Sequence, residues 1–137
     1  MKVINLSYLY YLTAPLVGGA DDDEMVKHYW DIDHNDENTI KEVIKSVVKP
    51  FFETNYSLLF RETVKETLAY HLSANKIDFA GLFNGQLHPF DHPTNPKLFY
   101  VWIWEVLFDG ESYGILNLDE YSEKDDPNEI IRLNFFK

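Results

Sequence analysis

The sequence predicts an α+β fold, in which two main helices pack on one face of an antiparallel sheet. An apolar run over 98–118 is broken by an Asp-Gly pair at 109–110, which can adopt the positive φ values of a tight hairpin turn. Two segments, 39–50 and 57–73, repeat apolar residues at helical spacing. Residues 130–136 alternate apolar and polar side chains as a half-buried strand does. We therefore expect an N-terminal strand and a C-terminal three-stranded meander, covered by two helices.

The N-terminal segment 2–12 provides the first predicted strand. Apolar or aromatic side chains fall on alternate positions there: Ile4, Leu6, Tyr8, Tyr10 and Leu12. The same segment imitates a signal peptide, but Asn5, Ser7, Thr13 and three tyrosines make a poor apolar core for one. It is also too short and too polar to span a bilayer. We expect it to be retained as part of the sheet.

Two helices follow. Thr39 and Glu42 have the spacing of a capping box, which predicts a helix start at 39. Pro50 predicts a stop or a kink. The expected buried stripes are Ile40, Val43, Ile44, Val47 and Val48 in the first helix, and Phe60, Val64, Leu68 and Leu72 in the second.

The segment 74–97 has no helical period and is rich in glycine and proline. Two interpretations stay open. Asn84-Gly85 could close a small hairpin between Phe79 and Phe90, or the segment could be a binding loop.

The meander begins with 98–108, where both faces of the predicted strand are apolar and Glu105 is the only charge. That pattern suits a strand covered on both sides. Glu105 would then lie at a sheet rim or pair with a base such as Arg132.

Composition limits the class of protein. A chain of 137 residues suits one domain, 1–137, with 45% hydrophobic residues and no cysteine. Disulfide scaffolds and thiolate metal sites are excluded, and a reducing compartment, the cytoplasm, is expected. No nucleophile elbow, phosphate-binding loop or paired-carboxylate spacing is present, so we expect no enzyme and no cofactor.

The net charge is −11, and it lies at the two ends of the sequence. Residues 1–40 hold eight acids and two bases, residues 98–137 hold nine and three, and the middle is nearly balanced. Such a surface repels nucleic acid and anionic lipid and attracts basic proteins. We therefore expect a basic protein partner, and neither nucleic acid nor a membrane.

A twelve-residue stretch resembles the calcium loop of EF-hands. Asp31, Asp33 and Asn35 occupy its first, third and fifth positions, and Glu42 the twelfth. Asp36 replaces the glycine that the sixth position normally needs. A calcium-binding module is therefore one alternative function; the other interpretation is that Glu42 caps a helix and the acids solvate a loop.

Aromatic residues lie beside the acidic segments, as they do in many protein interfaces. The expected partner-binding residues are Asp21, Asp22, Asp23, Glu24, Tyr29, Trp30, Asp31, Asp33, Asp36, Glu37, Glu120, Tyr121, Glu123, Asp125 and Asp126.

In overall profile the chain resembles bacterial immunity proteins of the contact-dependent growth inhibition type, which neutralise nuclease toxins. The resemblance rests on the acidic runs and on no residue-by-residue motif. It implies an acidic inhibitor that binds and blocks a basic nuclease toxin. The second alternative is a phage-encoded anti-defence protein that mimics the charge of nucleic acid.

Overall fold

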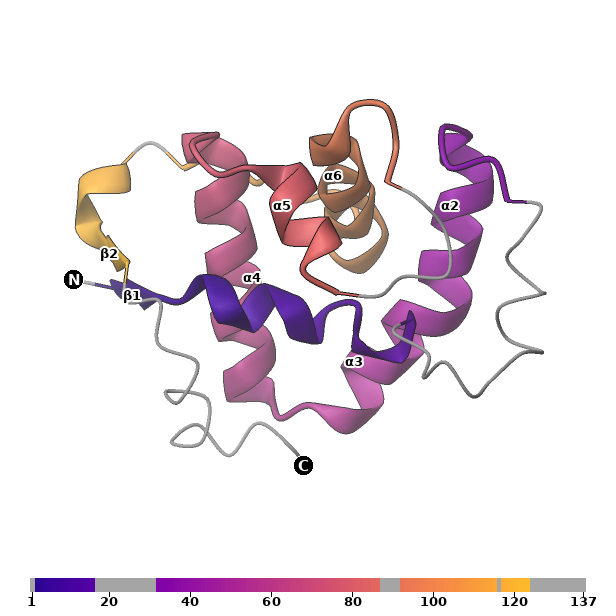
Figure 1. Ribbon diagram of the computed structural model, residues 1–137. Helices are drawn as coiled ribbons and strands as arrows, with labels where there is room; N and C mark the ends of the chain where they lie inside the picture. Colours follow the sequence, from indigo (N-terminus) through magenta and orange to yellow (C-terminus); the bar gives the residue numbers. More distant parts are fainter. Residues whose placement is uncertain (1, 17–31, 87–91, 116, 124–137) are drawn as a thin grey trace.

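The structure, a computed structural model, describes residues 2–16, 32–86, 92–115 and 117–123. Within them the protein is mostly helical, so the predicted antiparallel sheet is wrong. Figure 1 shows helices α2 to α6 grouped around one centre, with two short strands, β1 and β2, at one edge. The predicted last strand, 130–136, lies outside the described residues.

The N-terminal strand is much shorter than predicted. β1 spans Lys2–Ile4 and pairs in parallel with β2, Tyr121–Glu123, in the register Lys2 to Tyr121. Asn5 then caps a 3₁₀-helix, η1 (Leu6–Tyr11), by accepting a hydrogen bond from the Ser7 N–H at 2.9 Å. A second short 3₁₀-helix, η2, spans Ala14–Leu16. The side-chain cap diverts the backbone from the extended conformation after Ile4.

The first predicted helix is confirmed and extends further at both ends. α2 (Glu37–Val43), the π-helix η3 (Ile44–Val48) and α3 (Lys49–Asn55) follow one another without a break. Asp36, not Thr39, is the N-cap, and the predicted stripe residues Ile40, Ile44 and Val48 are fully buried. Pro50 does not stop the helix. It lacks an N–H for the usual bond, and the π-turns just before it rearrange the hydrogen bonding there.

The second predicted helix is also confirmed. α4 spans Leu58–Ala74, with Ser57 as its N-cap and Asn75 in the left-handed conformation (φ 54°) at its end. The four predicted stripe residues of α4 are buried: Phe60, Val64, Leu68 and Leu72.

Part of the segment 74–97, for which a hairpin was one of the two predictions, forms a helix. α5 spans Phe79–Asn84, and the Gly85 N–H closes it by donating to the carbonyl of Gly81 at 2.9 Å. Phe79 and Phe83 are buried in the core, so the first arm of the hairpin does not exist; Phe90 lies outside the described residues.

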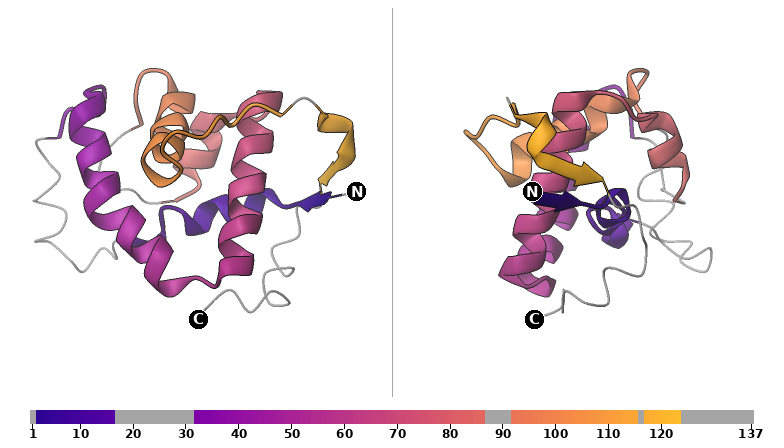
Figure 2. Two further views of the ribbon diagram at one scale, coloured as in Figure 1. Left: turned by 180° about the vertical axis from the view of Figure 1, so that it is seen from behind. Right: turned by 90° about the vertical axis from the view of Figure 1, so that its left-hand side faces the viewer.

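The most apolar run of the chain is a helix, where we predicted the central strand. α6 spans Pro96–Leu107, with the Asn95 side chain as N-cap and Pro96 at the first helical position. It packs against α2, α4, α5 and η3, and Figure 2 shows it between the neighbouring helices in the view from behind. Five of its side chains are buried in these contacts, Phe99, Tyr100, Trp102, Ile103 and Trp104, whereas Leu98 and Glu105 are exposed on the side that faces solvent.

The chain after α6 makes a turn but no hairpin. Gly110 has the positive φ (81°) that the sequence predicted at this position, yet it follows a helix end. Residues 111–115 have no regular structure and lie along α4, where Ser73 Oγ donates to the Tyr113 carbonyl and accepts from the Ile115 N–H. A short 3₁₀-helix, η4 (Leu118–Glu120), then leads into β2.

The buried side chains form one continuous cluster. Its largest fully buried members are Tyr56, Tyr100, Phe60 and Phe99, and edge-to-face ring contacts join many of its aromatic side chains.

Candidate functional site

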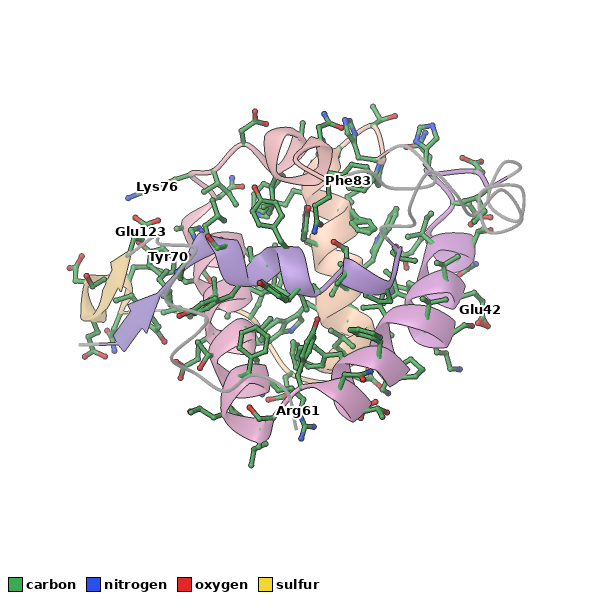
Figure 3. All side chains as sticks on the ribbon, turned by 60° about the horizontal axis from the view of Figure 1, so that its bottom comes forward. Glu42, Arg61, Tyr70, Lys76, Phe83 and Glu123 are labelled. Atoms are coloured by element: carbon green, nitrogen blue, oxygen red, sulfur yellow. The ribbon has the colours of Figure 1, made fainter. Side chains whose placement is uncertain are left out.

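The described acidic residues of the predicted interface fall into two separate groups. Asp33, Asp36 and Glu37 lie at the start of α2, whereas Glu120 and Glu123 lie in η4 and β2. Figures 1 and 2 place α2 and β2 at opposite ends of the molecule. Figure 3 shows the same separation between Glu42 in α2 and Glu123 in β2. The remaining predicted residues lie outside the described part of the chain: Asp21, Asp22, Asp23, Glu24, Tyr29, Trp30, Asp31, Asp125 and Asp126.

At the α2 end, the carboxylates of Asp33 and Asp36 accept hydrogen bonds from neighbouring residues. Asp36 accepts hydrogen bonds from the Asn38 N–H at 3.2 Å and from the Thr39 hydroxyl at 2.8 Å. Asp33 accepts from the Asn35 N–H at 2.9 Å. These bonds cap α2 and fix the turn before it, so both residues have a structural role that the sequence assigned in part to Thr39.

Lys41 partly neutralises this end. Its ammonium group lies 3.0 Å from Glu37, one helical turn away, and it also forms an ion pair with Glu105 of α6. The hydrogen bond to Glu105 is the main cause that raises the pKa of Lys41, with Glu37 adding to it and burial opposing it. Glu105 is therefore an exposed helical residue that pairs with Lys41, and it does not lie on a strand; Arg132, the partner suggested from the sequence, lies outside the described residues.

The β2 end differs in that its described carboxylates take no part in the ion pairs that the structure shows. We call Asp119, Glu120 and Glu123 the acidic β2 group; all three are exposed, and none forms an ion pair with a residue that the structure describes. Beside them the Tyr121 ring packs at a tilt against the Tyr70 ring, with centroids 5.5 Å apart and ring planes at 40°. Burial, and then the charges of Glu123 and Asp119, raise the pKa of Tyr70. Exposed carboxylates beside a half-buried tyrosine can accept hydrogen bonds from lysine or arginine side chains of another protein.

Two members of this site were missed from the sequence. Asp119 belongs to the acidic run that was recognised, and its position one residue before Glu120 is the signal that could have included it. Tyr70 lies on α4, far away in sequence, and only the packing of β2 on α4 brings it to the site.

Two described residues of the EF-hand-like stretch, Asn35 and Asp33, are engaged in hydrogen bonds of the fold. The Asn35 side chain accepts from the Thr94 N–H at 2.7 Å, which ties this turn to the start of α6, and Asp33 is used in the turn itself. Glu42 lies a full turn into the helix, and Asp31 is outside the described residues. Within the described ranges, no three histidine, aspartate or glutamate side chains lie close enough together to hold a metal ion.

Comparison with protein-family models, with curated proteins and with solved structures finds no match for this chain. Among the helices that the structure describes, none is long and apolar enough to cross a membrane.

Proposed function

We propose that the protein is an acidic protein-binding inhibitor of the immunity-protein type, which binds a basic nuclease toxin and blocks it. The acidic β2 group lies beside Tyr121, and its exposed carboxylates form no ion pair with a side chain that the structure describes; this is the observation that supports the proposal most directly. The net charge of −11 adds a long-range attraction for a cationic partner.

The physics assigns different tasks to the two kinds of residue. The carboxylates speed the encounter. They bind the cationic side chains with which a nuclease would otherwise hold the phosphate groups of its substrate. Tyr121, held against Tyr70 at 5.5 Å, supplies a rigid aromatic contact that costs little entropy to bury.

The direct test uses the product of the neighbouring reading frame in the source genome. If that product is a basic nuclease, adding the purified full chain should abolish its activity at about one equivalent. The association rate should fall at least about tenfold between roughly 0.01 M and 1 M salt, because the Debye length shrinks from about 30 Å to about 3 Å. The proposal would be refuted by full nuclease activity in the presence of excess inhibitor, or by an association rate that does not change with salt concentration.

A further inference from the structure

A cavity of about 400 Å³ opens beside η1, away from the acidic groups. Among the described residues it is lined by Ser7, Tyr10 and Tyr11 of η1, Ala14 of η2, and Gln86, which follows α5. Cavities of this size, with mostly apolar walls and a few polar groups, are typical small-ligand sites.

The walls of the cavity are held in place by contacts with the rest of the fold. Gln86 donates through Nε2 to the Tyr10 carbonyl at 2.9 Å, and its Oε1 accepts from the Thr13 hydroxyl. The Tyr11 ring packs edge-on against Phe60, with centroids 5.7 Å apart. The Tyr11 ring and the Tyr10 backbone are therefore positioned before any ligand arrives, which lowers the entropic cost of binding.

Two of the lining residues, Ser7 and Tyr10, carry a hydroxyl group. Neither Ser7 Oγ nor the Tyr10 hydroxyl forms a hydrogen bond with a residue in the described ranges. No lysine, arginine, aspartate or glutamate is among the described lining residues. The cavity thus offers flat apolar surfaces and neutral hydrogen-bonding groups, which suits an uncharged planar molecule.

We propose that this cavity binds an uncharged aromatic ring that carries one hydrogen-bonding group, such as a phenol or an indole. The ring could belong to a free small molecule or to a tyrosine or tryptophan side chain of a bound protein. This site goes beyond the inhibitor function and does not depend on it, because no residue of the acidic β2 group takes part.

The test is a titration of the full-length chain with p-cresol and indole, followed by calorimetry and ligand-observed NMR. We expect dissociation constants of about 1 mM or lower, and binding of toluene that is several-fold weaker than that of p-cresol. Ala14→Phe fills the cavity and should weaken the binding of both probes at least about tenfold. Ala80→Phe is the matched control, since Ala80 is also half-buried but lies in α5 outside the lining, and it should bind like the wild type.

A second variant tests the hydroxyl groups even if Ala14→Phe fails to fold. Ser7→Ala combined with Tyr10→Phe should make p-cresol and toluene bind about equally, because the preference for the phenol depends on those two groups. N-acetyltyrosinamide separates the two sources: binding as tight as that of p-cresol indicates a protein side chain, and much weaker binding indicates a free molecule. The proposal is overturned if p-cresol and indole do not bind at about 10 mM, or if folded Ala14→Phe binds them unchanged.

Discussion

Tyr56 lies at the centre of the aromatic part of the core. It occupies the link between α3 and α4, is only 1% exposed, and donates a hydrogen bond from its hydroxyl to the Tyr11 carbonyl at 2.9 Å. Its ring also contacts Phe60 edge-on at 5.1 Å. One side chain therefore joins η1 to the corner between two helices, and edge-to-face pairs of this kind add about 0.5–1.5 kcal/mol beyond area burial.

Alkaline solution should unfold the protein through its buried tyrosines. Burial raises the pKa of Tyr56 and of Tyr100 above the ordinary value of 10. Above pH 10 the unfolded chain loses these protons while the folded chain keeps them, so the free energy of unfolding falls as pH rises. Each tyrosine contributes a slope of up to about 1.4 kcal/mol per pH unit. Urea unfolding from neutral pH to about pH 11, with tyrosinate absorbance recorded in parallel, measures this slope.

The variant Tyr56→Phe separates the hydrogen bond from the titration. Near neutral pH it should lower the stability by about 1 kcal/mol, because the Tyr11 carbonyl loses the hydroxyl group that donates to it. Above pH 10 the difference from wild type should shrink, since phenylalanine has no proton to lose. A constant difference across the whole pH range would contradict this account.

At the scale of elements, α6 depends on the cap at its start. The Asn95 side chain accepts from the Lys97 N–H at 3.2 Å, and Asn95→Ala should destabilise the protein by about 1 kcal/mol through loss of this cap. Asn95→Asp keeps the acceptor and should stay within a few tenths of a kcal/mol of wild type. Denaturant unfolding of the three proteins checks the expectation, and an equal loss in both variants would show that the cap is not the cause.

The two helices that the sequence predicted correctly share one property. In 39–50 and 57–73, charged residues cover the faces that the apolar stripe leaves free, so the helical period is visible. In α6 both the helical and the alternating interpretation fit, because apolar residues occur at nearly all positions and only Lys97 and Glu105 are charged. Asn95 and Pro96, directly before the run, were the local signals that favoured a helix.

The N-terminal segment shows a second reason for error. Its alternation of apolar residues was real, but Ile4, Tyr8, Leu12 and Leu16 also repeat every four residues, and these are the side chains that are buried. The buried Leu9 fits the helical spacing and not the strand. Residues four apart lie on one side of a strand and also on one side of a helix, so the alternation alone did not distinguish the two structures.

At the scale of the whole molecule, the arrangement of charge could not be read from the sequence. The sequence identified the acidic runs, but whether they meet depends on the positions of α2 and β2, which lie at opposite ends (Figure 1). The 3₁₀-helix η1 crosses the space between these ends, with the uncharged cavity beside it. A partner would therefore have to span the length of the molecule to meet both groups of carboxylates, and we expect it to engage one of them.

Matched charge variants test which of these carboxylates meets a partner. The pair Glu120→Gln and Glu123→Gln removes two negative charges from the acidic β2 group, while Glu53→Gln and Glu62→Gln remove two from exposed positions on α3 and α4. Both double variants change the net charge equally, so a long-range effect of total charge alone would slow association equally in both. If the acidic β2 group is the interface, the first pair should reduce the association rate with the nuclease about three- to ten-fold more than the second and flatten its salt dependence. Stopped-flow fluorescence of the protein's tryptophans at several salt concentrations measures the association rate and its salt dependence. Equal association rates for the two double variants would show that the acidic β2 group is not the interface.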